Sequence, residues 1–324
     1  MNILIIGGAG FIGCHLCEGL LREHAVVCLD NLSTGSRENI KQLLSNSRFY
    51  FIREDITSDL RAIKARLSNA EIQRGFDWVL NLASPASPAA YAKMPVETML
   101  TGSAGTYNAL ELARAYNAGF LFTSTSEVYG DPEINPQHEG YFGNVNPIGA
   151  RSVYDEAKRF SEALIMAYHR KFRLKTRIVR LFNTFGSRMA SDDGRVVPTF
   201  ITQALANKPI TVFGSGKQTR SLCYVSDTVE GICAAITAED KDEINYPINV
   251  GSEEELSIVE LAKKIIKLSS SSSRIEFKDL PEDDPKVRRP DITRARKLLG
   301  WEPKVNVDEG LVKTIEWFRS KCSQ

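Results

Sequence analysis

Short apolar runs alternate with amphipathic segments along the first half of the chain. Six runs have the length and composition of buried strands: residues 2–7, 25–30, 48–55, 77–83, 119–124 and 176–183. The segments between them place apolar side chains three and four residues apart, most clearly over 152–172, as a helix with one buried face does. Strands that alternate with helices predict an α/β fold with a parallel sheet covered on both faces.

Beyond Asn183 this rhythm gives way to segments that are interrupted by glycine and proline. The pattern then predicts a helix over about 226–238, a short strand over 246–251, and helices over 257–268 and about 307–320. The second half of the chain is therefore expected to add elements around the sheet as well as to extend it.

These two parts predict a division into domains. We expect a Rossmann-type doubly wound parallel sheet formed by residues 1–182 and 221–251. A smaller, discontinuous C-terminal domain is expected from residues 183–220 and 252–324, because insertions after such a sheet often form a second domain.

The composition excludes several classes of protein. The chain has 324 residues, of which 43% are hydrophobic, enough for a large core. Its formal net charge of +1 creates no field that would gather nucleic acid or an anionic membrane. No run reaches the roughly 18 apolar residues of a membrane span, and the N-terminus lacks the basic flank of a signal peptide. Six scattered cysteines suggest reduced thiols, so we expect a cytoplasmic protein without a metal ion.

A glycine pattern joins the first predicted strand to the first predicted helix. Gly7, Gly10 and Gly13 form G-x-x-G-x-x-G, which allows a tight turn and a close approach of pyrophosphate to backbone N–H groups. Asp30 ends the second strand, where its carboxylate would bind adenosine ribose hydroxyls and repel a 2′-phosphate. The pattern therefore predicts a dinucleotide site that prefers NAD to NADP.

Other residues near the carboxyl ends of the strands complete the predicted NAD site. Asp55 ends the third strand, where it would meet the adenine amino group, and small residues at the end of the fourth strand leave room for ribose and nicotinamide. The further residues expected at the cofactor are Phe11, Ile12, Asn31, Thr34, Gly35, Ile56, Leu82, Ala83, Ser84, Thr101, Tyr154 and Lys158.

A candidate chemical site follows the fifth predicted strand, which ends in the sequence T-S-T-S-E. Tyr154 and Lys158 come next as Y-x-x-x-K on one face of a helix. A tyrosine that acts as a base near pH 7 must lose about three units from its free pKa of about 10. We expect the Lys158 ammonium and a positive nicotinamide ring to lower that pKa together. Thr125 would then donate to the substrate oxygen as it becomes a ketone.

These motifs resemble the extended short-chain dehydrogenase/reductase superfamily. Within it, several segments are similar to those of the UDP-glucuronate decarboxylases, and the resemblance covers nearly the whole chain. The segments are ASPASP, STSEVYGDP, NPIGARSVYDEAKR, FNTFGSRM, DDGRVV, GSGKQTR and LLGWEP. The resemblance implies oxidation of the sugar at C4 with NAD, loss of carbon dioxide, protonation at C5 and return of the hydride to C4. It also implies a homodimer formed through paired long helices, including the one that carries Tyr154.

The resemblance assigns roles residue by residue. It makes Tyr154 the base, Lys158 its electrostatic partner and ribose ligand, and Thr125 the hydrogen-bond donor to the 4-hydroxyl. Ser126 and Glu127 would lie near C5 and C6 of the sugar, with Glu127 handling a proton or orienting the substrate. The positions implied to hold the UDP-sugar are Pro85, Asn183, Arg195, Val197, Phe213, Gln218, Arg220 and Arg288.

Alternatives stay open at this point. The decarboxylases carry K-T-N where this chain has Leu100, Thr101 and Gly102, and the missing lysine is expected near the sugar or its carboxylate. A UDP-hexuronate or UDP-hexose 4-epimerase would use the same groups and NAD but return the hydride to the other face of the ketone. A nucleotide-sugar 4,6-dehydratase is disfavoured because that family has T-D-E at 125–127. A non-catalytic dinucleotide sensor would commonly lack the tyrosine or the lysine.

Overall fold

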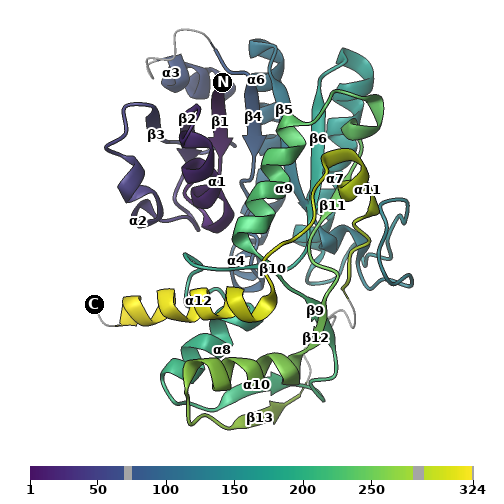
Figure 1. Ribbon diagram of the computed structural model, residues 1–324. Coiled ribbons are helices and arrows are strands. Elements are labelled where there is room, and N and C mark those ends of the chain that lie inside the picture. Colours follow the sequence, from purple (N-terminus) through teal and green to yellow (C-terminus); the bar gives the residue numbers. More distant parts are fainter. Residues whose placement is uncertain (69–74, 280–287, 323–324) are drawn as a thin grey trace.

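The structure, a computed structural model, describes residues 1–68, 75–279 and 288–322 (Figure 1). Seven strands of this described part pair side by side in the spatial order β11 (Ile248–Val250), β6 (Thr176–Leu181), β5 (Gly119–Thr125), β4 (Trp78–Asn81), β1 (Asn2–Ile6), β2 (Ala25–Asp30) and β3 (Phe49–Arg53). All the pairings between them are parallel. The strand order reverses between β1 and β4, as in a doubly wound sheet, so the predicted fold class is confirmed.

Helices occupy the connections, because consecutive parallel strands need a crossover. The helices beside the sheet are α1 (Phe11–Leu21), α2 (Arg37–Ile40), α3 (Leu60–Ser68), α4 (Pro88–Lys93), α5 (Pro95–Leu100), α6 (Thr106–Tyr116), α7 (Ser152–Phe172), α9 (Val225–Thr237) and α11 (Thr293–Leu299). A π-helical turn, η2 (Thr101–Gly105), joins α5 to α6. The predicted helices over 152–172 and about 226–238 are thus confirmed as α7 and α9.

Alternation along the strands gives the sheet two buried faces. In β1, Ile3 and Ile5 belong to one apolar cluster, while Leu4 and Ile6 belong to the other. The first cluster includes side chains from α1 and α9, and the second includes side chains from α3, α6 and α7. Burial on both faces explains why these strands read as nearly continuous apolar runs in the sequence.

A smaller group of elements lies at the carboxyl ends of the strands, below the sheet in Figure 1. Its helices are α8 (Val196–Leu205), α10 (Ile258–Ser269) and α12 (Val307–Cys322). Its strand pairs are β7 (Thr184–Phe185) with β10 (Cys223–Tyr224), β8 (Ile210–Phe213) with β13 (Ile275–Lys278), and β9 (Thr219–Ser221) with β12 (Glu255–Ser257). The helices predicted over 257–268 and about 307–320 are confirmed as α10 and α12.

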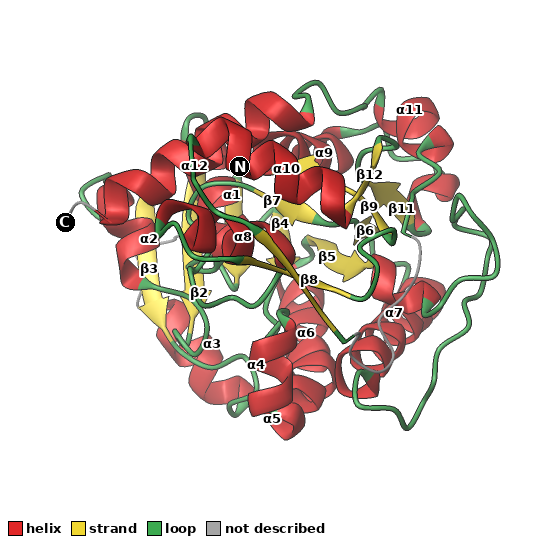
Figure 2. Cartoon of the chain, turned by 90° about the horizontal axis from the view of Figure 1, so that it is seen from below, coloured by secondary structure: helices red, strands yellow, loops and turns green. Residues whose placement is uncertain are grey.

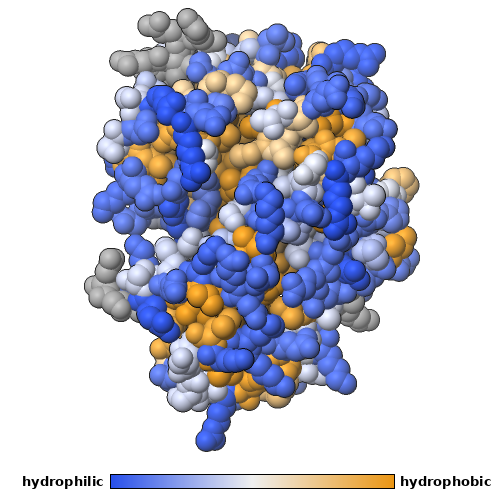
Figure 3. Space-filling view, in the orientation of Figure 1, coloured by the Kyte–Doolittle hydropathy of each residue, from blue (hydrophilic) through white to orange (hydrophobic). Residues whose placement is uncertain are grey.

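The surface is mostly hydrophilic and the described cysteines are unpaired, as the composition predicts. Hydrophilic side chains cover most of the face seen in Figure 3, with smaller hydrophobic areas between them. Among the described residues, no helix has both the length and the apolar composition that a membrane crossing requires. The cysteines that the structure describes are free thiols: Cys14, Cys17, Cys28, Cys223 and Cys233.

Candidate active site

A cavity of about 900 Å³ lies between the carboxyl edge of the sheet and the elements below it. This volume is at the upper end of the range for ligand pockets. Every residue that the sequence predicted for the cofactor, the chemistry or the substrate lines this cavity. The structure therefore brings together side chains that lie as far apart in the sequence as Gly7 and Arg288.

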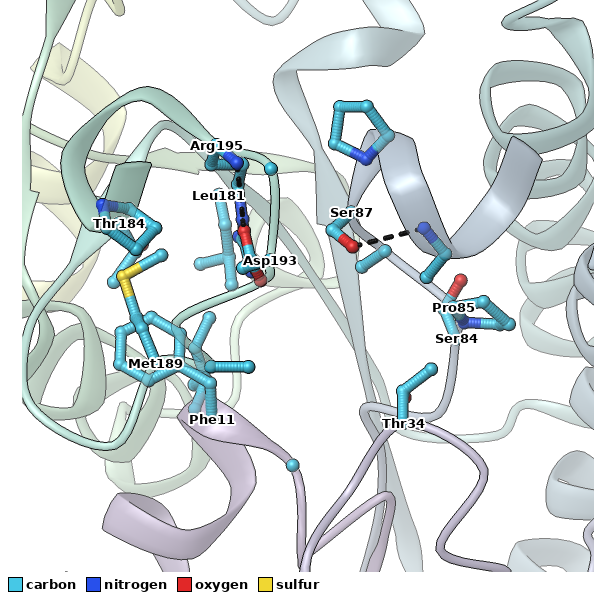
Figure 4. Close-up of a pocket in the computed structure, with 18 of the residues that line it drawn as sticks. Phe11, Thr34, Ser84, Pro85, Ser87, Leu181, Thr184, Met189, Asp193 and Arg195 are labelled. Atoms are coloured by element: carbon cyan, nitrogen blue, oxygen red, sulfur yellow. Dashed lines mark hydrogen bonds and ion pairs between the residues drawn. The ribbon is translucent and has the colours of Figure 1, made fainter. Parts of the chain in front are cut away.

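Figure 4 shows two walls of the cavity. Phe11 and Met189 lie on one side, while Ser84 and Pro85 lie on the other, at the start of the segment that leads to α4. The Ser87 hydroxyl accepts a hydrogen bond from the backbone of α4 and so caps that helix. The second wall is thus held by a capped helix rather than by a free loop.

The glycine turn after β1 is closely packed against the next strand connection. Gly7 has φ +82°, which residues with a side chain rarely adopt, and a Cβ there would stand 2.7 Å from the Ala83 nitrogen. A Cβ on Gly13 would collide with the Gly7 carbonyl oxygen. Gly10 and Phe11 at the N-terminus of α1 also line the cavity. The turn therefore forms an open cradle at a helix N-terminus, a suitable place for a pyrophosphate.

Asp30 ends β2 beside this turn. Its two carboxylate oxygens accept hydrogen bonds from the backbone N–H groups of Ala9 at 2.9 Å and Leu32 at 2.8 Å. Burial raises the pKa of Asp30, and these hydrogen bonds partly oppose that rise. Each carboxylate oxygen can accept a further hydrogen bond, so the site fits the pair of hydroxyls on a ribose.

Asp55 lies at the end of the cavity lined by Asn31. Its carboxylate accepts hydrogen bonds from the Asn31 side chain at 2.7 Å and from the backbone and hydroxyl of Thr57 at 2.8 and 2.7 Å. Burial raises the pKa of Asp55, but the hydrogen bonds outweigh burial and leave the pKa below its ordinary value. Asp55 is therefore an ionised acceptor, which suits an exocyclic amino group.

Tyr154 and Thr125 meet where α7 crosses the end of β5. Tyr154 is 7% exposed. Burial raises its pKa above the ordinary value, although a hydrogen bond with Thr125 and the charge of Arg195 oppose the rise. The lowered pKa that the sequence predicts is therefore not a property of the protein alone.

Lys158 lies one helical turn after Tyr154. Its Nζ donates to the Thr123 carbonyl at 2.9 Å and stands 4.5 Å from the centre of the Phe122 ring and 5.8 Å from that of Tyr154. Burial lowers the pKa of Lys158 to about 7, although the Glu162 carboxylate opposes this effect. In the protein alone, Lys158 is largely charged only below about pH 7.

Glu127 lies in a short turn, η3 (Ser126–Tyr129), directly after β5. Arg288 pairs with both of its oxygens, through Nη1 to Oε1 and through Nη2 to Oε2 at 2.7 Å. Arg151 Nη2 donates to Oε2 at 2.5 Å. Burial raises the pKa of Glu127, but the charges of Arg288 and Arg151 hold it below its ordinary value. Glu127 is thus an ordered, ionised carboxylate between two cations rather than the frayed end of a strand.

The remaining predicted substrate residues line the same cavity. Arg195 forms an ion pair with Asp193, with Nη2 and Oδ2 2.7 Å apart (Figure 4). Arg220 is 8% exposed and adds positive charge around Glu127. Gln218 donates from its side chain to the Phe213 carbonyl at 2.8 Å. The cavity wall below the sheet is therefore rich in cations, as an anionic ligand requires.

The side chain of Leu100 lies outside the cavity. Its side chain is 47% exposed at the end of α5 and does not line the cavity, whereas the next residue, Thr101, does. Gly102 packs against α7, where a Cβ would stand 2.7 Å from the Ala157 Cβ. Leu100 therefore contributes no side chain to the cavity lining, and the expected neighbour of the sugar at position 100 stays a prediction.

Two residues of the site escaped the sequence analysis. Arg151, at the N-cap of α7, lies within the segment NPIGARSVYDEAKR, but the sequence assigns it no role. Its place three residues before Tyr154 puts both at the same helix start. The Tyr91 ring lines the cavity and stacks on the Tyr154 ring, with their centroids 5.5 Å apart. No spacing in the sequence relates Tyr91 on α4 to Tyr154 on α7.

The fold and this cavity define a nucleotide-binding α/β protein of the Rossmann class, with a tyrosine–lysine pair at the carboxyl edge of its sheet. Residues 3–251 match the NAD dependent epimerase/dehydratase family, and the chain belongs to that family.

Similar sequences and similar structures point to related activities. UDP-glucuronic acid decarboxylase 5 of Arabidopsis thaliana is 48% identical over 98% of this chain and 89% of its own length. UDP-glucuronic acid decarboxylase 1 of Danio rerio is 46% identical over 98% of this chain and 72% of its own length. Among solved structures, the UDP-glucuronic acid 4-epimerase of Bacillus cereus with UDP-glucuronic acid and NAD has a TM-score of 0.85 at 32% identity, covering 99% of this chain and 100% of its own.

Proposed function

We propose that the protein is an NAD-dependent carboxy-lyase that converts UDP-glucuronate into UDP-xylose through a 4-keto sugar. One observation carries this proposal: the Tyr154–Thr125 pair and the Glu127–Arg288 ion pair line the same cavity. The first pair suits oxidation of a secondary alcohol, and the second would offer a cation to a sugar carboxylate. The UDP-glucuronic acid decarboxylases that are 45–48% identical over nearly the whole chain support the same assignment.

NAD fits the residues at the carboxyl edge of the sheet. The glycine cradle at Gly7, Gly10 and Gly13 would hold the pyrophosphate, Asp30 the adenosine ribose, and Asp55 the adenine amino group. When bound, NAD supplies an acceptor and later a donor for the hydride at C4 of the sugar. Since the hydride returns to the same substrate, no net oxidation takes place.

The residues of β5 and α7 would manage the proton on the 4-hydroxyl. Tyr154 would remove that proton, and Thr125 would donate a hydrogen bond to the same oxygen. Lys158 would bind the second ribose and, when protonated, stabilise the phenolate form of Tyr154. Burial of all three groups excludes water from the developing charge.

The Glu127–Arg288 pair would bind the hexuronate end of the substrate. Both Nη groups of the buried Arg288 pair with Glu127, so a sugar carboxylate would share this cation with Glu127 through the remaining N–H donors. Glu127 and Ser126 would lie near C5 and C6, and the ionised form of Glu127 makes it an acceptor of protons or hydrogen bonds rather than a donor. A second, partly buried cation, Arg151, also pairs with Glu127 and adds positive charge at this end of the cavity.

The UDP part would occupy the lower wall of the cavity. Pro85, Asn183, Arg195, Val197, Phe213, Gln218 and Arg220 would contact it. We propose residues 1–182 and 221–251 as the NAD-binding domain, which also supplies Pro85 and the end of β5 to the sugar, and residues 183–220 and 252–324 as the UDP-sugar-binding domain. Removal of the arginines should therefore weaken the affinity for UDP more than the affinity for NAD.

Incubation with UDP-glucuronate and mass spectrometry of the product tests the proposal. A decarboxylase must give a UDP-pentose that is lighter by the mass of carbon dioxide. A product of unchanged mass with an inverted C4 proton signal in NMR would instead identify a 4-epimerase, the activity of several similar solved structures. No turnover of any UDP-sugar would favour a dinucleotide sensor.

The homodimer is also a proposal, and an apolar face formed by α5, α6 and α7 supports it. Figure 2 shows these helices along one side of the molecule, and α5 contacts α7. Large apolar side chains on this face are exposed: Met99, Leu100, Tyr107, Phe160 and Phe172. Exposed apolar side chains that form one contiguous patch can mark a protein interface. Sedimentation of the protein should give a dimer, and Phe160→Glu should give a monomer; a monomeric parent protein would refute the proposal.

We also propose a cytoplasmic location. The described cysteines are free thiols, which suits a reducing compartment. Fractionation of cells that express a tagged form of the protein would test this assignment.

A further inference from the structure

Gln137 binds the chain that follows Arg288. Its backbone N–H donates to the Arg289 carbonyl at 2.8 Å, and its side-chain Oε1 accepts from the Arg289 N–H at 2.9 Å. Its own carbonyl accepts from the Asp291 N–H at 2.8 Å. Gln137 is 1% exposed, so these bonds are shielded from water. They fix the backbone one to three residues beyond Arg288.

Asn249 attaches this contact to the central sheet. It lies in β11, is fully buried, and donates from Nδ2 to the carbonyls of Gln137 and Asp291, both at 3.0 Å. Its Oδ1 accepts from the Tyr129 hydroxyl at 2.8 Å. Tyr129 belongs to η3, the same short turn that carries Glu127. Asn249 therefore hydrogen-bonds both to the turn that carries Glu127 and to Gln137, which holds the backbone after Arg288.

These contacts close a ring around the Glu127–Arg288 ion pair. The chain joins Glu127 to Tyr129, and hydrogen bonds join Tyr129 to Asn249 and Asn249 to Gln137. Gln137 binds the backbone of Arg289, which is next to Arg288, and Arg288 pairs with Glu127. A bidentate ion pair requires both donors of the guanidinium to face both oxygens, so it tolerates little displacement of either backbone. The backbone on the Arg288 side is the part that Gln137 holds.

We propose that Gln137 is a positioning residue of the reaction: its side-chain oxygen sets where the Arg288 guanidinium stands relative to Glu127 and to the carboxylate of the sugar. The kinetic part of this inference rests on the proposed decarboxylase function. The structural part does not, because the position of Arg288 is observable without substrate.

The side chain of Gln137 can be altered without changing its length. Gln137→Met removes the acceptor for the Arg289 N–H, and Gln137→Glu keeps an acceptor at the same place while removing the donor to the Ile134 carbonyl. We expect Gln137→Met to lower kcat/KM at least about tenfold, since a displacement of an ångström in a site can cost that much or more. Gln137→Glu should retain activity within about threefold, and both variants should bind NAD as the parent does.

A double-mutant cycle separates positioning from general stability. Arg288→Ala should weaken substrate binding or turnover severely, and adding Gln137→Met to it should change little more, because the group that Gln137 positions is gone. Asn245→Leu is the matched control: Asn245 also clamps a backbone N–H, that of Thr176, but it is remote from the cavity. It should lower the Tm without lowering kcat/KM. Additive losses in the cycle would overturn the proposal, and so would equal losses in Gln137→Met and Gln137→Glu.

A crystal structure of Gln137→Met gives a readout that needs no turnover. The guanidinium of Arg288 should move off Glu127 while the sheet is unchanged. An unmoved Arg288 would overturn the positioning role whatever the activity. If Arg288 is displaced in Gln137→Met but the parent protein does not decarboxylate UDP-glucuronate, the proposed function is refuted and the positioning role stands.

Discussion

The rings of Tyr91 and Tyr154 lie nearly parallel, with centroids 5.5 Å apart and an angle of 11° between their planes. Both rings are buried, and both line the cavity. The stacking depends on the rings and not on the hydroxyls. The hydroxyl of Tyr154 can therefore be removed without removing the packing of its ring.

Tyr154→Phe should lower turnover by at least about a hundredfold while NAD binding stays nearly intact, the scale expected for loss of a positioned base. Steady-state kinetics with UDP-glucuronate and a fluorescence titration with NAD would measure the two effects. Tyr116→Phe serves as the control, because Tyr116 packs on Phe76 away from the cavity. Near-normal turnover in Tyr154→Phe would contradict the assignment.

Asp30 should decide the preference between cofactors. Asp30→Ala should weaken NAD binding and reduce discrimination against NADP, because the buried carboxylate excludes a 2′-phosphate by charge. The affinities of both nucleotides can be measured by calorimetry on the parent and the variant. Similar affinities for NAD and NADP in the parent protein would show that Asp30 does not select the cofactor.

Lys158 should make the nucleotide-free protein less stable. Its pKa falls from 10.5 to about 7 in the folded state, so the folded state binds its proton more weakly than the unfolded state does. The resulting cost is complete below pH 7 and shrinks as the pH rises from 7 to 10.5, where the unfolded state also loses the proton. Lys158→Met should therefore raise the Tm at pH 7, on the order of 3 °C or more, and raise it less at pH 10.

Differential scanning calorimetry at several pH values would measure this trend. Lys171→Met, on the exposed end of the same helix, is the matched control. The same Lys158→Met protein should be nearly inactive, because the charge beside Tyr154 is lost. An unchanged or lower Tm at pH 7 would contradict the destabilising role of Lys158.

The sequence predicted the sheet and the cofactor side of the cavity well, because both depend on local rules. Apolar runs that alternate with helices specify parallel strands, and the carboxyl ends of such strands meet at one edge. Gly7 and Asp30 follow β1 and end β2, so their proximity follows from the order of the strands alone. The glycine turn could be predicted from residues 7–13 alone.

Contacts between distant segments could not be predicted in the same way. Arg151 at the start of α7 pairs with Glu127 in η3, and Tyr91 on α4 stacks on Tyr154 on α7. No periodicity in the sequence encodes either contact. The side chain of Leu100 is 47% exposed at the end of α5, while the next residue, Thr101, lines the cavity. The amphipathic pattern does not distinguish these two positions.

Arg151 should control the pH range in which Glu127 is ionised. Arg288 and Arg151 together hold the pKa of Glu127 below its ordinary value against the effect of burial. Without the charge of Arg151, burial would prevail more strongly and the pKa would rise. If the ionised carboxylate is the active form, activity is lost as the pH falls through this pKa. Arg151→Met should therefore shift the acid limb of the kcat/KM profile to higher pH. Arg151→Lys keeps the charge and should shift the limb less, and Arg170→Met, exposed on the same helix, should leave it in place. An acid limb that is identical in Arg151→Met and the parent, with the fold retained, would mean that Glu127 ionisation does not limit the reaction.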